Sequence, residues 1–127
     1  MNAQTQTDAL EVGRKLVDFC KSNEVVKAIE TLYADDIESR EAMDTPDMPA
    51  ESHGKQNALK KNKQWEETME VHSSQIDGPF PSGDRFAVYF NYDATDKKTN
   101  KRWAMEEVGI YTVKDGKIVK EEFFYTM

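Results

Sequence analysis

The chain of 127 residues contains a single cysteine, Cys20, which excludes an internal disulfide. Long apolar runs are also missing, since none approaches the ~20 residues that a membrane-spanning helix requires. Positive charge is scarce: 17 lysines and arginines stand against 24 aspartates and glutamates, and the net charge is −7. This acidic balance argues against binding to nucleic acids and to anionic membranes. Residues 1–8 lack the basic start and apolar core of a signal peptide, so the expected location is cytoplasmic.

Patterns typical of metal and cofactor sites are absent as well. The two histidines, His53 and His72, lie 19 positions apart and, with one distant cysteine, match no known spacing of metal ligands. The sequence also contains no Gly-rich phosphate loop, no nucleophile elbow and no catalytic Cys–His pattern. We therefore expect neither a metal nor a cofactor.

What the sequence does contain is most distinctive in its C-terminal third, where three long strands and two hairpins are predicted. Apolar residues at the even positions from Phe86 to Tyr92 follow the period of two that is typical of a half-buried strand. A polar turn leads to a second predicted strand over residues 103–113. Asp115-Gly116 then predicts a tight hairpin, because a type I′ turn needs positive φ at both central positions, and a third strand follows over 118–125.

The N-terminal part of the chain predicts helices first. Apolar stripes with helical spacing cover residues 9–21 and 25–33. The pair Asp35-Asp36 is expected to end the second helix, and a short extended segment is predicted over 37–42. Residues 44–52 are rich in Pro, Asp, Met and Ser and are expected to form a loop.

A third helix is predicted to start after Gly54 and to carry Trp65 on its apolar side. A strand over 70–76 follows and is expected to end at the Gly/Pro-rich residues 78–83. The predicted order is α-α-β-α-β-β-β-β in a single domain over residues 1–127. This order is typical of an α+β fold with its helices on one face of a mostly antiparallel sheet.

Three short motifs extend this pattern to a family resemblance: Tyr33-Ala34-Asp35-Asp36, the Asp115-Gly116 turn with Lys117-Ile118, and the closing residues 121–125. Together with the element order they resemble the SnoaL-like branch of the nuclear transport factor 2-like superfamily, over almost the whole chain. The resemblance implies a cystatin-like cone in which three N-terminal helices pack on a curved sheet. The superfamily includes steroid isomerases, polyketide cyclases, epoxide hydrolases, dehydratases and non-catalytic binding domains, so the fold implies a cavity but no particular reaction.

The resemblance also implies which strand faces line the cavity. The pattern of the steroid isomerases places alternate residues of the last three strands on the concave face, including Glu107 and Glu121. Trp65 and Tyr33 are expected to join them from the helical side. The implied pocket residues are Tyr33, Trp65, Phe86, Val88, Phe90, Tyr92, Met105, Tyr111, Phe123 and Tyr125.

Glu41 is the leading candidate for a catalytic group. It lies five residues after Asp36, and the steroid isomerases carry their carboxylate base at the position counted in this way from the same Ala-Asp-Asp. A carboxylate at the mouth of an apolar cavity is poorly hydrated and therefore suited to accept a proton. The alternative is an exposed glutamate that pairs with Arg40 or Lys55.

The rest of the isomerase machinery does not carry over. Gly109 stands where the steroid isomerases have an oxyanion-hole acid, and Lys15 or Leu16 stands in place of their donor tyrosine. Steroid isomerisation is therefore not expected, unless Tyr92, Tyr111, Tyr125 or a protonated Glu107 supplies the missing donors.

Two further residues are candidates for acid–base roles. His72 is expected in a strand near the cavity mouth, with a half-buried structural histidine as the alternative. Glu106 and Glu107 must point to opposite faces of their strand, so only one of them reaches the cavity, and we assign Glu107 to it. The alternative is that one of them is an ion-paired surface residue and the other an edge or interface residue.

The lysines of the third predicted helix, Lys55, Lys60, Lys61 and Lys63, are expected to form a solvated face. The predicted function is binding of a small hydrophobic or aromatic molecule, with cofactor-free acid–base chemistry by Glu41. The alternative is a non-catalytic binding or interaction module. The strands also have an apolar second face, with Tyr89, Val108, Ile110 and Phe124, which predicts a homodimer through the sheet.

Overall fold

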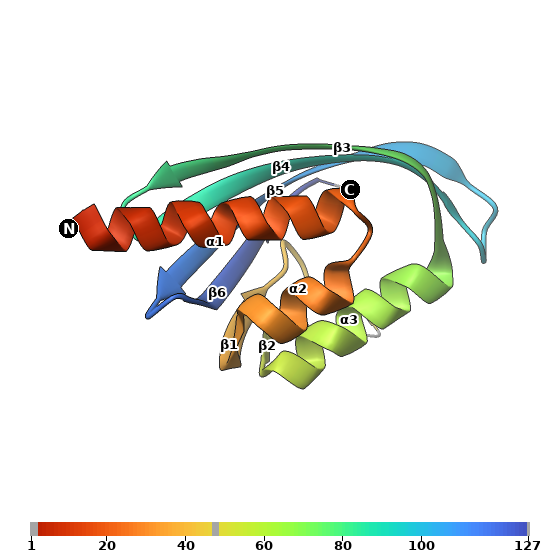
Figure 1. The fold of residues 1–127 in the computed structure, drawn as a ribbon. Coiled ribbons are helices and arrows are strands. Elements are labelled where there is room, and N and C mark those ends of the chain that lie inside the picture. The colour runs from red at the N-terminus through yellow and green to blue at the C-terminus, as the bar shows by residue number, and fades with distance from the viewer. Residues whose placement is uncertain (1–2, 47–48, 127) are drawn as a thin grey trace.

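The computed structural model describes residues 3–46 and 49–126 (Figure 1). Three helices and six strands follow one another along the chain. Their bounds are α1 (Ala3–Lys21), α2 (Val25–Leu32), β1 (Tyr33–Arg40), β2 (Glu51–His53), α3 (Lys55–Thr68), β3 (Met69–Ser82), β4 (Arg85–Asp96), β5 (Arg102–Lys114) and β6 (Lys117–Phe124).

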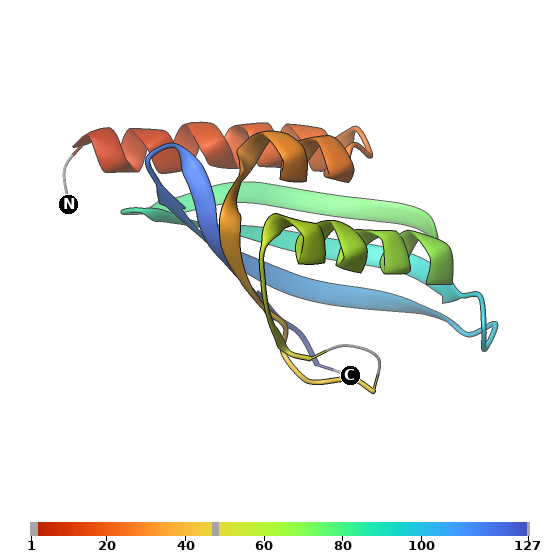
Figure 2. The same ribbon diagram turned by 90° about the horizontal axis from the view of Figure 1, so that it is seen from below.

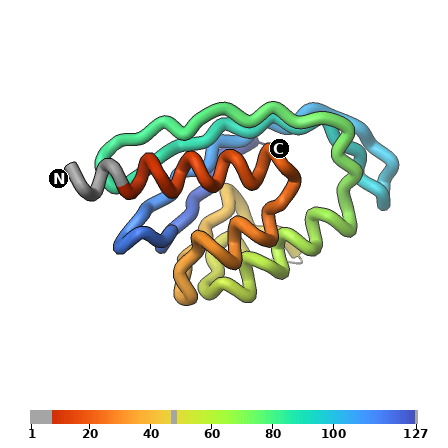
Figure 3. Tube along the Cα trace, viewed as in Figure 1, coloured from red at the N-terminus to blue at the C-terminus, as the bar shows by residue number. Residues whose placement is uncertain are grey.

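The strands form one curved sheet in the order β2-β1-β6-β5-β4-β3. Only β1 and β6 run parallel, and every other neighbouring pair is antiparallel. The helices lie on the concave side, with α1 under the arch of β3 and β4, and α2 and α3 side by side below it (Figures 1 and 2). The long strands β3, β4 and β5 extend beyond the end of α1 (Figure 3). This is the predicted α+β cone.

The core lies between α1, α2 and the concave face, as the periodicity predicts. Residues at helical spacing on α1, from Ala9 to Val17, are buried. On β4, Phe86, Val88 and Phe90 are buried, whereas the residues between them are only partly so. The alternation therefore fixes the concave face that the sequence suggested, and the other face points away from the helices.

The structure adds one strand to the predicted order. β2 lies within the segment expected to be a loop, and its three residues pair with the end of β1. Its residues, Glu51 to His53, are polar and include no apolar alternation, so the sequence carried no signal for it. β1 itself begins directly at Tyr33, so the pair Asp35-Asp36 lies inside a strand and does not end the helix.

β3 also differs from the prediction, because it continues through Gly78 and Pro79 to Ser82. The pairing with β4 shifts between Asp77 and Phe80, so this irregularity accommodates the proline without ending the ladder. The turn at Asp115-Gly116 is confirmed: both residues have positive φ, 52° and 77°. Among the described residues no helix is both long and apolar enough to cross a bilayer.

Gly13 allows α1 to pack closely on β3. A Cβ atom at this position would lie 2.7 Å from Cβ of Pro79 and 3.1 Å from Cδ2 of Phe86. Gly13→Ala is therefore expected to lower the free energy of unfolding by about 1–3 kcal/mol, even though alanine favours a helix by up to ~1 kcal/mol. Urea unfolding of this variant and of Lys15→Ala, an exposed control on α1, checks this. An unchanged or higher stability of Gly13→Ala would contradict this, because Pro79 would then shift to accommodate the added methyl group without cost.

Candidate functional site

A groove of about 1460 Å³ lies between the helices and the concave face of the sheet. This volume exceeds the ~300–1,000 Å³ of most small-molecule sites, so a small ligand would fill only part of it. The side chains that line it come from all three helices, from β4, β5 and β6, and from the segment after β1. They include Cys20, Tyr33, Glu41, Lys61, Trp65, Phe90, Tyr92, Met105, Glu107, Tyr111, Glu121, Phe123 and Tyr125.

Aromatic rings form much of the groove wall. Trp65 of α3 contacts Tyr92 of β4 at a centroid distance of 5.6 Å, and Tyr92 stacks on Phe90 at 6.0 Å. On the neighbouring strands, Tyr111 meets the edge of Phe123 at 6.0 Å. Such a wall offers both ring faces and ring edges to an apolar or aromatic ligand.

Lys61 of α3 brings charge into this apolar setting. Its Nζ atom lies 2.8 Å from Oε1 of Glu41 and 4.0 Å from Oε2 of Glu121. The three side chains are largely removed from solvent, with exposed fractions of 12% for Lys61, 23% for Glu41 and 4% for Glu121. The ammonium also lies 5.4 Å from the ring centroid of Phe123. A buried cation therefore joins two carboxylates that come from different strands.

Glu121 of β6 is the most deeply buried carboxyl group of the groove. It accepts a hydrogen bond of 2.5 Å from the hydroxyl of Tyr33 and one of 2.6 Å from Oγ of Ser39. Burial raises the pKa of Glu121, while Lys61 and the two hydroxyl donors oppose this shift. The hydroxyl hydrogens of Tyr33 and Ser39 are thereby committed to Glu121.

Glu107 of β5 is the carboxyl group best placed to exchange a proton near neutral pH. Burial raises its pKa to about 7, and the negative charges of Glu41 and Glu121 add to the shift, which Lys61 partly offsets. Protonated and ionised forms of Glu107 thus coexist at neutral pH. A group poised in this way can serve as a general acid or a general base.

Glu41 reaches the groove because three strands end near one another. It follows the last residue of β1, and its backbone N–H donates to the carbonyl of Ala50 at 2.7 Å. β6 ends at Phe124, which pairs with Val108, so β5 continues toward Arg102 without a neighbour on that side. The sheet therefore has a notch beside Glu107.

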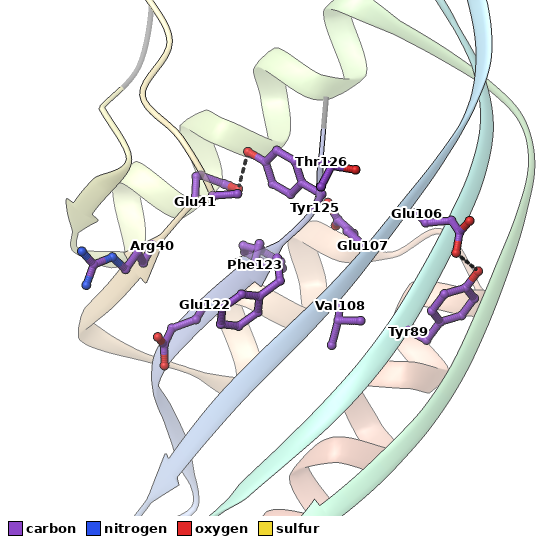
Figure 4. A pocket seen from close by; sticks show the side chains of 12 residues that line it. Arg40, Glu41, Tyr89, Glu106, Glu107, Val108, Glu122, Phe123, Tyr125 and Thr126 are labelled. Carbon is purple, nitrogen blue, oxygen red and sulfur yellow. Dashed lines mark hydrogen bonds between the residues drawn. The ribbon is translucent and has the colours of Figure 1, made fainter.

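The side chain of Glu41 lies across this notch from Tyr125, whose hydroxyl donates to Oε2 of Glu41 at 3.3 Å (Figure 4). Burial and the nearby Glu41 raise the pKa of Tyr125 to about 12. A second pocket of about 630 Å³ opens here, on the side of Tyr89 and Val108, and it shares Glu41, Glu107 and Tyr125 with the groove. These shared residues thus border both openings.

Most of the residues expected in the pocket line the groove, but three expected site residues lie elsewhere. Phe86 and Val88 are fully enclosed in the core, with exposed fractions of 1% and 0%, and are not part of the groove lining. His72 is exposed on β3, where its Nε2 lies 2.7 Å from Oγ1 of Thr95. It is likewise absent from the lining of the groove.

Lys61 and Ser39 are the site residues that the sequence did not reveal, whereas Glu121 was expected on the concave face and lines the groove. Lys61 was expected on a solvated face, but it lies three residues after the buried Ala58 and four before Trp65, on the inward side of α3. That spacing was the available signal, and the neighbouring lysines masked it. Cys20 also lines the groove, and burial raises the pKa of its thiol to about 12, which keeps it protonated. In the described ranges no group of three potential metal ligands comes together.

Comparison with known proteins places the chain in a family, because the SnoaL-like domain matches residues 7–125. The chain belongs to the SnoaL-like family. A crystal structure from Mesorhizobium loti, provisionally labelled a SnoaL-like polyketide cyclase and also a carbohydrate phosphatase, is 43% identical. The superposition has a TM-score of 0.85 and covers 91% of this SnoaL-like chain and 97% of the Mesorhizobium loti chain.

More distant structures share the fold. An NTF2-like protein from Burkholderia thailandensis is 18% identical, with a TM-score of 0.78 and coverage of 93% of this chain and 90% of its own. A protein from Bacillus subtilis, provisionally labelled an isomerase, is 17% identical, with a TM-score of 0.76 and coverage of 99% and 90%. No curated protein matches the chain. The SnoaL-like fold is thus shown, and the chemistry depends on the groove.

The raised pKa of Glu107 predicts how the stability of this SnoaL-like domain depends on pH. The folded state holds the proton of Glu107 more tightly than the unfolded chain, in which the pKa of this group is 4.5. The stabilisation from this proton is therefore present below pH 4.5 and is lost as the pH rises through about 7. Glu107→Gln does not titrate. It is expected to match the wild type near pH 4.5 and to exceed its unfolding free energy at pH 8 by about 1–3 kcal/mol.

Chemical denaturation at both pH values measures this difference. Glu106→Gln is the matched control, since Glu106 lies on the opposite face of the same strand and accepts a hydrogen bond from Tyr89. The control should keep the pH dependence of the wild type. An equal gain for Glu107→Gln at both pH values would contradict the raised pKa.

Proposed function

We propose that this domain binds a small hydrophobic or aromatic molecule in the groove and performs cofactor-free acid–base chemistry on it, with Glu41 as the proton acceptor. The observation that carries the proposal is the ion pair between Glu41 and Lys61 at the edge of an aromatic groove. A carboxylate that is mostly removed from water and paired with an ammonium is placed to accept a proton from a ligand in the groove.

Glu107 complements Glu41 as the proton donor. The two carboxyl groups have different environments, because Glu41 pairs with an ammonium at 2.8 Å whereas burial raises the pKa of Glu107 to about 7. Environments that separate two carboxyl groups in this way assign one of them to the base and the other to the acid. The reaction classes that need only such a pair are isomerisation, aldol-type cyclisation, dehydration and hydrolysis.

The aromatic residues would hold the ligand, and the relatives are consistent with this class of reaction. Trp65, Phe90 and Tyr92 offer apolar contacts, and Tyr111 offers a hydroxyl group near the carboxyl cluster. The labels polyketide cyclase and isomerase, carried by the Mesorhizobium loti and Bacillus subtilis proteins, name two of these reaction classes. His72 has no part in the proposal, since it lies outside the groove.

Removal of the base tests this function directly. Exchange of α-protons for deuterium in a panel of small aromatic ketones, followed by NMR in D₂O, reports proton abstraction without a known product. Glu41→Gln is expected to lower the exchange rate by at least about 100-fold, the usual contribution of a general base. Glu51→Gln, which changes an exposed pair with Arg40, should exchange at the rate of the wild type. Equal rates for all three proteins would remove Glu41 from the mechanism.

A non-catalytic binding module is the second candidate, and one observation favours it. Both carboxylate oxygens of Glu41 have partners, Lys61 and the hydroxyl of Tyr125, as in a carboxylate that only supports structure. In that case Glu41→Gln would lower the melting temperature without changing any turnover. Native mass spectrometry that shows a small molecule retained by the wild type, with no exchange activity, would support the binding module.

We also propose that the protein forms a homodimer through the outer face of the sheet. Tyr89, Val108 and Phe124 are adjacent across three strands of that face, and the last two have exposed fractions of 36% and 55%. A contiguous apolar row on a sheet can meet its own copy around a two-fold axis, which shields both rows from water.

Sedimentation velocity tests the dimer. Phe124→Asp places a charge at one end of the apolar row and is expected to yield a monomer with the circular dichroism spectrum of the wild type. Val26→Asp is the control, since Val26 is 43% exposed on α2, on the helical side of the sheet. A wild type that sediments as a monomer, or a dimer that persists in Phe124→Asp, would contradict the interface.

A further inference from the structure

Lys61 is the charged group of the groove whose role the acid–base pair does not explain. Its Nζ atom is buried, and no acceptor in the part of the chain that the structure describes completes a hydrogen bond to it. The carboxylate of Glu41 is close, at 2.8 Å, but the contact is an ion pair without hydrogen-bond geometry. The ammonium therefore has N–H donors to offer to an oxygen atom inside the groove.

The hydroxyl donors that contact the two carboxylates around Lys61 are already used. The hydroxyls of Tyr33 and Ser39 donate to Glu121, and the hydroxyl of Tyr125 donates to Glu41. Cys20 offers only a weak S–H donor. Among these described neighbours, the ammonium of Lys61 is thus the strongest donor that a ligand could meet, and it carries a full positive charge.

We propose that Lys61 binds the ligand oxygen on which negative charge develops when the ligand gives a proton to Glu41. The inference rests on the proposed function and deepens it, because it names the group that stabilises the anion. In this role Lys61, which lies on α3, takes the place of the oxyanion donors of the steroid isomerases. This sequence lacks those donors at Gly109 and on the first helix.

The charges of the site balance during this step. Before the transfer, Lys61 is paired with the Glu41 carboxylate. The ligand's C–H or O–H bond then breaks, its electron pair stays on the ligand, and the proton forms an O–H bond on Glu41. Glu41 becomes neutral, and Lys61 is left to pair with the new oxyanion, so the buried site keeps the same net charge. Such an exchange of partners avoids leaving an unpaired charge in a poorly hydrated groove.

This balance defines the class of ligand. The ligand must enter neutral, because a carboxylate or phosphate would meet Glu41 and Glu121 while both surround the ammonium. It must also be able to place a negative charge on oxygen after it loses a proton. Aromatic ketones with an acidic neighbouring C–H fulfil both conditions, and so do phenols, whose rings suit the wall formed by Trp65 and Tyr92.

The test uses 4-nitrophenol, whose phenolate has its own visible absorption band and needs no turnover to be seen. At a pH about one unit below the pKa of free 4-nitrophenol, the wild type is expected to raise the phenolate fraction of the bound molecule at least about threefold. Lys61→Met should lose this phenolate band and bind the phenolate about 10- to 100-fold more weakly, since a charge-assisted hydrogen bond is lost. Lys63→Gln, on the exposed face of the same helix, should behave as the wild type.

A second variant keeps the lysine and does not depend on the folding of Lys61→Met. Glu41→Gln leaves Lys61 without its close partner, so this variant should bind the phenolate at least about tenfold more tightly than the wild type. Loss of deuterium exchange in Glu41→Gln with a retained phenolate band would support both proposals. Unchanged exchange in that variant would overturn the role of Glu41 alone.

Three results would overturn the role of Lys61. The first is a phenolate band that persists in a folded Lys61→Met variant. The second is an affinity of Glu41→Gln for the phenolate that does not exceed that of the wild type. The third is a wild type that does not bind 4-nitrophenol up to its solubility limit, because the groove would then reject the ligand class.

Discussion

The groove depends on one constraint, which is that buried carboxyl groups require either a cation, hydrogen bonds or a proton. Three of the glutamates that line it satisfy this requirement in three different ways. Glu41 pairs with Lys61, Glu121 accepts hydrogen bonds from Tyr33 and Ser39 while Lys61 stays at 4.0 Å, and the pKa of Glu107 rises to about 7 so that it can keep a proton. A single ammonium cannot neutralise three carboxylates, and this shortage is what leaves a titratable group in the site.

The one parallel strand pair of the sheet brings these groups together. In the register of β1 and β6, Ser39 lies opposite Glu121, so the hydroxyl donor and the carboxylate are neighbours in adjacent strands. Glu41 follows two residues later, just past the end of β1, where alternation returns its side chain to the same side as that of Ser39. α3 then supplies Lys61 from the opposite wall. The arrangement thus combines side chains positioned by three elements, β1, α3 and β6.

What the sequence could predict follows from this geometry. Alternation along β4 and β5 was enough to group the residues that share a face, and the Asp115-Gly116 turn fixed a hairpin, because both signals are local. The choice of the concave face came from the family resemblance. Glu41 was found through the family pattern, and Glu107 was found through the alternation of its strand. Lys61 was missed because its inward direction depends on where α3 docks, and β2 because its three polar residues are held only by pairing with β1. Lys61 and Glu41 are too far apart in the sequence for a local pattern to encode their ion pair.

Gly109 bears on why the proposed acid of this site is Glu107. A Cβ atom at position 109 would lie 2.9 Å from Cε2 of Tyr111 and 3.2 Å from Cε1 of Phe123, so the two rings already occupy the space that a side chain there would need. The steroid isomerases, which the chain resembles, carry an acid at this position. On a strand, the next residue on the same face is two positions away, and here that residue is Glu107. It lies closer to the notch, within the field of Glu41, which contributes to its raised pKa. The packing of Tyr111 thus leaves the proposed proton donor farther along β5, closer to Glu41, the proposed base.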